Sequence, residues 1–188
     1  VAAAVRLRST VDALDPVDHD VVTANGLSAR DLVVHLAAQE SLFAQALGIP
    51  TVPDIVELEV EARTAAFVAR FHELDDAVDV WRRSVEAVRA WVSERDSLDD
   101  AATVAWLGSE LPVDGVLVAR AFQNWLHRDD LREVQGRGPT VPPVVELHGM
   151  AELSAAILSP GLAVVERTRP GATAPLVLTG SGGGEWLV

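Results

Sequence analysis

Apolar residues recur every three to four positions over several long stretches of this chain, and this spacing limits what it can fold into. Residues 78–92 are the clearest case, with charged residues at the positions between. The apolar positions there are Val78, Trp81, Val85, Val88 and Val92. Such spacing is typical of an amphipathic helix that buries one face against other elements. The chain is therefore predicted to be mainly α, with its helices packed around a shared core.

Further stretches show the same spacing, and residues that begin or end helices border them. Ser28 is predicted to cap a helix that has Asp31 in its first turn, while Gly48 and Pro50 end it. Asp75 is predicted to cap the helix containing residues 78–92. The other helices are predicted at 1–14, 28–46, 56–71 and 113–134, and a short strand or turn at 103–106.

The composition changes after residue 135, where the run GRGPTVPP at 136–143 predicts a hinge. A helix at 146–158 follows, and then two strands at 176–179 and 186–188 joined by a glycine-rich hairpin loop. One helix and two strands are too few for a complete sheet domain. The predicted organisation is a helical bundle at 1–137, a hinge at 138–145 and a partial α+β domain at 146–188.

Composition excludes several classes of protein. Hydrophobic residues make up 49% of 188 residues, enough for a sizeable core, and no apolar run approaches the ~20 residues of a membrane helix. A net charge of -13 argues against nucleic-acid binding, which depends on basic side chains. Cysteine is absent, so metal ligands and nucleophiles must be other residue types. We expect a cytoplasmic protein that binds neither membranes nor nucleic acids; the oligomeric state is left open.

His35 and His127 lie on the predicted inward faces of two helices, and Gln123 lies one turn before His127. Together these side chains would place three donors on one side of a metal and leave positions open, as a catalytic zinc requires. Asp130 could orient His127 from behind the site. The same spacing also fits two core histidines that are satisfied by local hydrogen bonds.

Trp125 lies close in sequence to the candidate donors. It has two possible roles. It could line a substrate pocket beside the metal, or it could simply pack in the core. Its large apolar ring favours packing in the core.

Three segments resemble motifs of the mycothiol-dependent maleylpyruvate isomerase family. They are GLSARDLVVHLAAQE at 26–40, EARTAAFVARF at 61–71 and LHRDDLREVQGRGP at 126–139. Their order and separation agree with the second, third and fourth helices of that family, over about residues 1–140. The tail 175–188 resembles part of the family's C-terminal domain, which is similar to sterol carrier proteins. The resemblance implies a DinB-like four-helix bundle followed by a partial α+β sterol-carrier-like domain.

The resemblance also implies a divalent metal site, usually taken as zinc. The family's ligands are a histidine on the second helix and a Glu-x-x-x-His pair on the fourth. His35 and His127 match, but Gln123 stands at the glutamate position. A neutral amide is a poorer ligand than a carboxylate, so the change should weaken the site, alter its metal or abolish it. Leu27 is a second departure, because the family commonly has tryptophan there.

By resemblance, the chain is a mycothiol-dependent and metal-dependent isomerase or thiol transferase that acts on a small electrophilic substrate. The absence of cysteine is consistent with a thiol supplied by a cofactor. Two other functions stay open. One is a metal-free, non-catalytic relative that binds a small ligand or a partner protein. The other is a different metal-dependent transferase or hydrolase on the same bundle, because a fold does not fix its chemistry.

Overall fold

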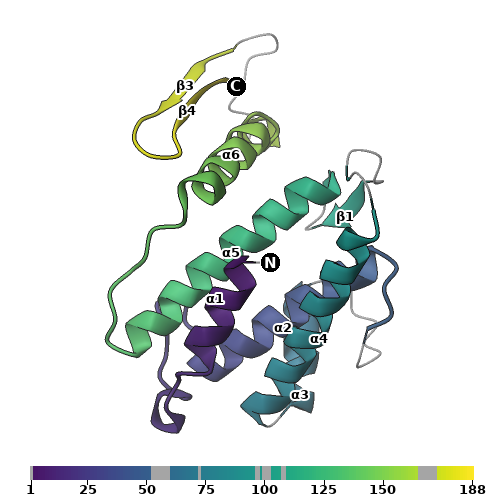
Figure 1. Cartoon of the computed structure of the whole chain (residues 1–188), viewed down its shortest axis with the longest axis vertical. Helices are drawn as coiled ribbons and strands as arrows, with labels where there is room; N and C mark the ends of the chain where they lie inside the picture. Colours follow the sequence, from purple (N-terminus) through teal and green to yellow (C-terminus); the bar gives the residue numbers. More distant parts are fainter. Residues whose placement is uncertain are drawn as a thin grey trace.

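Helices dominate the computed structural model, which describes residues 2–51, 60–71, 73–95, 98, 103–106, 109–164 and 173–188 (Figure 1). The helices are α1 (Ala2–Val11), α2 (Ala29–Ala46), α3 (Val60–Arg70), α4 (Leu74–Ser93), α5 (Val113–Val134) and α6 (Val144–Val164), with a 3₁₀ turn at Pro16–Asp18. The strands are β1 (Val104–Trp106), β2 (Ser109–Leu111), β3 (Pro175–Leu178) and β4 (Gly184–Leu187).

The helix α2 lies at the centre of the bundle. It packs against α3, α4 and α5, while α1 packs along α5. The prediction of a mainly α, DinB-like bundle is confirmed, and α5 has the bounds predicted from its spacing. Among the described residues, no helix is both long enough and apolar enough to cross a membrane.

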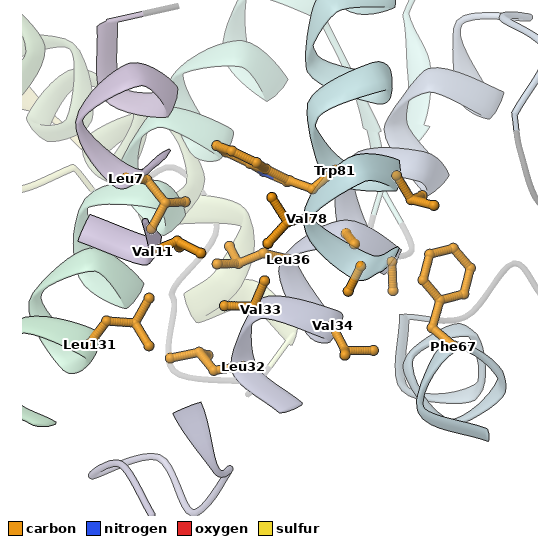
Figure 2. Close-up of a cluster of buried hydrophobic side chains, with 14 of the residues drawn as sticks. Leu7, Val11, Leu32, Val33, Val34, Leu36, Phe67, Val78, Trp81 and Leu131 are labelled. Carbon is orange, nitrogen blue, oxygen red and sulfur yellow. The ribbon is translucent and has the colours of Figure 1, made fainter. Parts of the chain in front are cut away.

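Figure 2 shows the main hydrophobic core, to which α1, α2, α4 and α5 each contribute. Leu7, Leu36 and Leu131 are at most 1% exposed, and Trp81 is 4% exposed. Burying one such side chain contributes about 1.5–3 kcal/mol. The core therefore fixes how α2 and α5 face each other, and these two helices carry the candidate metal donors.

Ser28 begins α2, and its Oγ accepts a hydrogen bond of 3.0 Å from the backbone N–H of Asp31. We expect Ser28→Ala to lower the free energy of unfolding by about 1 kcal/mol, because that N–H loses its partner. Urea denaturation followed by far-UV circular dichroism measures the change. Ser28→Asn is the control, because its side-chain oxygen can still accept that hydrogen bond, and it should cost little. Equal losses for both variants would contradict the capping role.

Two predictions of local structure were wrong or incomplete. Glu73, not Asp75, is at the N-cap position of α4, and no side chain caps that helix. Asp75 lies in the first turn, where its charge still favours the helix dipole. The strand predicted at 103–106 is present as β1, but no strand is predicted for its antiparallel partner β2. Strands of three residues are too short for alternation to mark them.

The C-terminal segment packs on the bundle through α6, which begins two residues before the predicted start and continues to Val164. Gly149 lies against Val118, and Gly115 lies against Leu153, so the close approach of α5 and α6 uses small residues. An ion pair between Arg6 and Glu146 also joins α1 to α6. The predicted hairpin is present as antiparallel β3 and β4. The domain boundaries stay a prediction.

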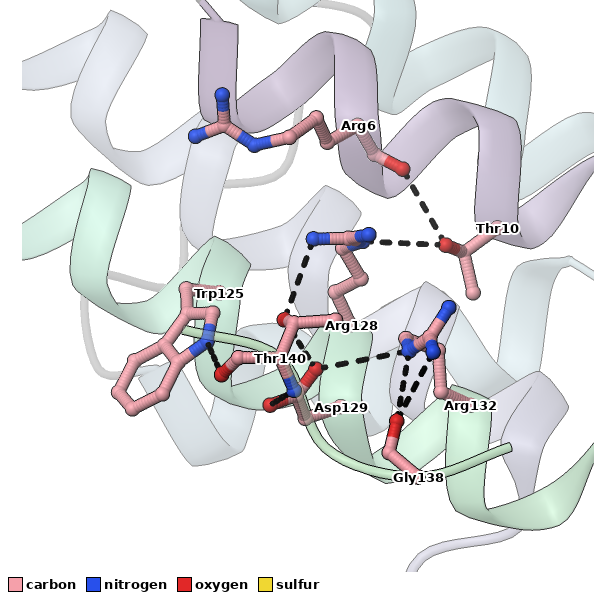
Figure 3. A network of polar contacts seen from close by, with 8 residues as sticks. All are labelled: Arg6, Thr10, Trp125, Arg128, Asp129, Arg132, Gly138 and Thr140. Atoms are coloured by element: carbon pink, nitrogen blue, oxygen red, sulfur yellow. Dashed lines mark hydrogen bonds and ion pairs between the residues drawn. The ribbon is translucent and has the colours of Figure 1, made fainter. Parts of the chain in front are cut away.

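Polar contacts fasten the predicted hinge to α5 (Figure 3). Asp129 accepts hydrogen bonds from the backbone N–H and the hydroxyl of Thr140, at 2.8 and 2.7 Å. Arg132 donates to the carbonyl of Gly138 at 2.9 Å. The indole N–H of Trp125 donates to the carbonyl of Thr140 at 3.0 Å. The segment that follows the bundle is therefore held along about the last three turns of α5.

Candidate metal centre

The imidazole rings of His35 and His127 face each other between α2 and α5. Their centroids are 5.7 Å apart, and their planes meet edge to face at 89°. Two imidazoles that share one tetrahedral zinc, with Zn–N near 2.0 Å, have centroids about 5 Å apart. The observed separation therefore lies within about 1 Å of the one that shared coordination requires.

The loop before α2 and the last turns of α5 hold the His127 ring. Nδ1 of His127 lies 3.1 Å from Oδ2 of Asp130, which also accepts a hydrogen bond of 3.2 Å from Asn25. A carboxylate can only accept here, so Nδ1 carries the proton and Nε2 keeps its lone pair. Asp130 thus occupies the position that an orienting residue behind His127 needs.

The His35 ring is held by groups on α2 and α3. Its Nε2 lies 2.7 Å from the side-chain nitrogen of Gln39, and its Nδ1 lies 3.0 Å from the hydroxyl of Thr64. Gln39 lies one turn after His35 on α2, so the two side chains share a helix face. No sequence pattern marks Thr64, because a single threonine on a helix has many equivalents in the chain.

Gln123 is half-buried, and its amide oxygen accepts a hydrogen bond of 2.5 Å from Nη1 of Arg120. The same Nη1 donates to the amide oxygen of Gln39. Nε and Nη2 of Arg120 donate to one carboxylate oxygen of Glu40, at 3.0 and 2.7 Å. The third predicted donor is therefore part of a network centred on a cation.

Glu40 and Arg120 form a buried ion pair, with side chains 6% and 4% exposed. Arg120 is one of the buried residues of α5, but no sequence pattern identifies its partner. The signal that was present is a charged residue on an otherwise apolar face. Charged residues are almost never fully buried unless they are paired, so each one implied a partner.

Burial keeps both imidazoles neutral. The pKa of His35 is lowered to about 4, mainly by burial and in smaller part by the charges of His127 and Arg120. Burial also lowers the pKa of His127, while the hydrogen bond and charge of Asp130 oppose that change. At neutral pH both rings therefore have a lone pair, which a metal donor needs.

A divalent cation would meet a weaker donor set here than two histidines and a glutamate. In the part of the chain that the structure describes, no group of three His, Cys, Asp or Glu side chains is placed to hold a metal. The donors are two imidazoles and the Gln123 amide oxygen, which Arg120 already engages. Glu40 balances the charge of Arg120, and Asp130 adds one negative charge behind His127.

Trp125 does not face the histidine pair. Its ring stacks on Phe122 with centroids 5.7 Å apart, and its N–H is bonded to Thr140 in the segment after α5. Residues two apart on a helix point in very different directions, so Trp125 and His127 occupy different sides of α5. These contacts hold the half-buried Trp125 against Phe122 and the segment after α5, and both predicted roles stay predictions.

The helical bundle, which carries His35 on α2 and His127 on α5, has the DinB-like architecture that the sequence predicted. The chain belongs to the mycothiol maleylpyruvate isomerase family, because its residues 1–132 match the model of that family's N-terminal domain. A crystal structure of a mycothiol-dependent maleylpyruvate isomerase, a histidine-to-alanine mutant, has a similar fold. The TM-score is 0.63 and the sequence identity is 16%.

That match covers 84% of this chain and 65% of the isomerase chain. This chain therefore spans slightly less than two thirds of the length of that isomerase. At this identity the likeness establishes the fold alone. No match was found among curated proteins.

Proposed function

We propose that this chain is a mycothiol-dependent enzyme, or the bundle part of one, in which His35, Gln123 and His127 hold a divalent metal, most simply zinc. Its reaction is the addition of the mycothiol thiol to a small electrophilic substrate, as an isomerase or a thiol transferase. The observation that carries the proposal is the edge-to-face approach of two neutral imidazoles from separate helices, 5.7 Å apart. Membership of the family supplies the class of chemistry.

A divalent metal, when bound, lowers the pKa of a thiol and so supplies a thiolate nucleophile at neutral pH. The chain has no cysteine, so that thiol has to come from outside the protein. The residues of the chain have three tasks in this proposal. His35 and His127 donate from neutral rings, Asp130 holds the ring of His127, and burial limits competition from protons.

A second candidate function, supported by different observations, is a metal-free relative that binds a small ligand. Arg120 engages the oxygen of Gln123, which weakens that oxygen as a metal donor. In addition, a largely apolar cavity of about 270 Å³ lies between α1, α4 and α5, beside the Glu40–Arg120 pair. Asn124 and Leu117 also line this cavity.

Metal content tests the first proposal. Purified protein, incubated with zinc and then dialysed, should keep about one equivalent if His35, Gln123 and His127 together bind one ion, as we propose. We expect His127→Ala to lose the zinc. Gln123→Glu should tighten zinc binding about tenfold or more, because an anionic carboxylate is a better zinc ligand than a neutral amide. Inductively coupled plasma mass spectrometry and competition with a chelator measure both.

His148→Ala is the matched control, because His148 lies on α6 beside the hairpin and is exposed. It should keep the zinc of the unmodified chain. Failure of the unmodified chain to retain zinc, with retention restored by Gln123→Glu, would favour the metal-free relative. If neither the unmodified chain nor Gln123→Glu retains zinc, then His35, position 123 and His127 do not form a metal site. Turnover that needs no thiol would instead favour a different metal-dependent enzyme.

A further inference from the structure

Arg120 is the centre of a hydrogen-bond chain that ends on His35. Its guanidinium is planar and only donates, and the two bonds to Glu40 fix its plane. The remaining edge carries Nη1, whose two hydrogens are directed to the amide oxygens of Gln39 and Gln123. The Glu40–Arg120 ion pair is buried, so water does not compete for these hydrogen bonds.

The direction of each following hydrogen bond is determined by Arg120. Because Nη1 donates, the oxygen of the Gln39 amide must accept, and the amide nitrogen must point the other way. That nitrogen lies 2.7 Å from Nε2 of His35 and donates to it. Nε2 of His35 is therefore unprotonated. The ring proton is on Nδ1, which donates to the hydroxyl of Thr64 at 3.0 Å.

Thr64 alone would not settle where the proton lies. A hydroxyl both donates and accepts, so it can pair with either form of Nδ1. The amide of Gln39 could likewise turn over if nothing held its oxygen. Arg120 removes this freedom, because reversing the amide would bring two donors together.

We infer that Arg120 is a positioning residue that acts through Gln39 to set the tautomer of His35, with the proton on Nδ1 and the lone pair on Nε2. Asp130 sets the same tautomer for His127 on the other side of the site. The two rings therefore both carry their lone pair on Nε2 when no cation is bound. This inference deepens the proposed function and rests on it only for the use of His35 as a donor.

The tautomer can be measured directly in the metal-free protein. Protein labelled with ¹⁵N in histidine is treated with a chelator, and the two ring nitrogens of His35 are observed by NMR at neutral pH. Comparison with His35→Gln assigns the signals. We expect the unmodified chain to show a protonated Nδ1 and an unprotonated Nε2, because a bonded neighbour decides which ring nitrogen carries the proton.

Gln39→Glu is the decisive variant. The introduced carboxylate accepts only, so it should pair with Arg120 and take a hydrogen bond from Nε2 of His35. The proton of His35 should then move to Nε2, or the ring should become doubly protonated. Gln39→Met removes the directional contact without this reversal, and so does the double variant Glu40→Leu with Arg120→Met. Each should give a mixture of tautomers.

The signals of His127 are the internal control, because Asp130 holds that ring independently of Gln39. They should keep the Nδ1-protonated pattern in all of these variants. A protonated Nε2 in the unmodified chain would overturn the inference. So would an unchanged His35 pattern in folded Gln39→Glu or, if that variant does not fold, in Gln39→Met. Zinc plays no part in the measurement, so a failure of zinc uptake would count against the proposed function alone.

Discussion

Replacing Glu40 with leucine should lower the free energy of unfolding by about 3–5 kcal/mol, because it leaves a buried guanidinium without its counter-charge. Arg120 is 4% exposed on its side chain, and Glu40 supplies its only ion pair among the described residues. Removing one partner of a buried pair costs far more than the pair itself contributes. Urea denaturation with circular dichroism detects the loss as a lower midpoint at an unchanged slope.

The double variant Glu40→Leu with Arg120→Met tests the cause. Both charges are then absent, and the apolar side chains fill a similar volume, so most of the lost stability should return. Asp79→Ala is the surface control. It breaks an exposed pair with Arg82 and should cost less than about 1 kcal/mol. A loss for Glu40→Leu no larger than that of Asp79→Ala would contradict a buried ion pair.

The second large effect concerns acid. The pKa of His35 is about 4 in the folded chain and near its ordinary value of 6.5 in the unfolded chain. Between these two values the unfolded chain binds more protons, so stability should fall as the pH drops from 6.5 toward 4. The loss from His35 alone should reach at most about 3 kcal/mol, and partial exposure of the ring screens part of it.

The contribution of His35 can be isolated by a variant that does not titrate. In metal-free protein, the free energy of unfolding is measured from pH 7 to pH 4.5 for the unmodified chain and for His35→Gln. The free energy of unfolding of the variant should fall less steeply as the pH drops. The difference in slope should correspond to at most one bound proton. The lowered pKa of His127 acts in the same direction and remains in both proteins. Parallel curves would show that His35 titrates equally in the folded and unfolded chains.

Local spacing was sufficient to predict the helices. The stripe from Val78 to Val92 and the cap at Ser28 are properties of one helix at a time, so neighbouring residues determine them. The same reasoning placed His35 and His127 on inward faces, and the structure brings their rings together. Helical periodicity indicates which face of each helix is buried. Polar side chains on buried faces need partners inside the bundle, which limits where they can lie.

What lies opposite each inward residue was decided only by the tertiary structure. The pairing of Glu40 with Arg120, the contact of Thr64 with His35 and the turning of Trp125 toward the segment after α5 depend on how helices rotate and slide against one another. Those rotations are set by the packing of the whole core, to which residues far apart in sequence contribute. The sequence by itself therefore determined the helices and their buried faces, while the network that holds the candidate donors followed from how those faces meet.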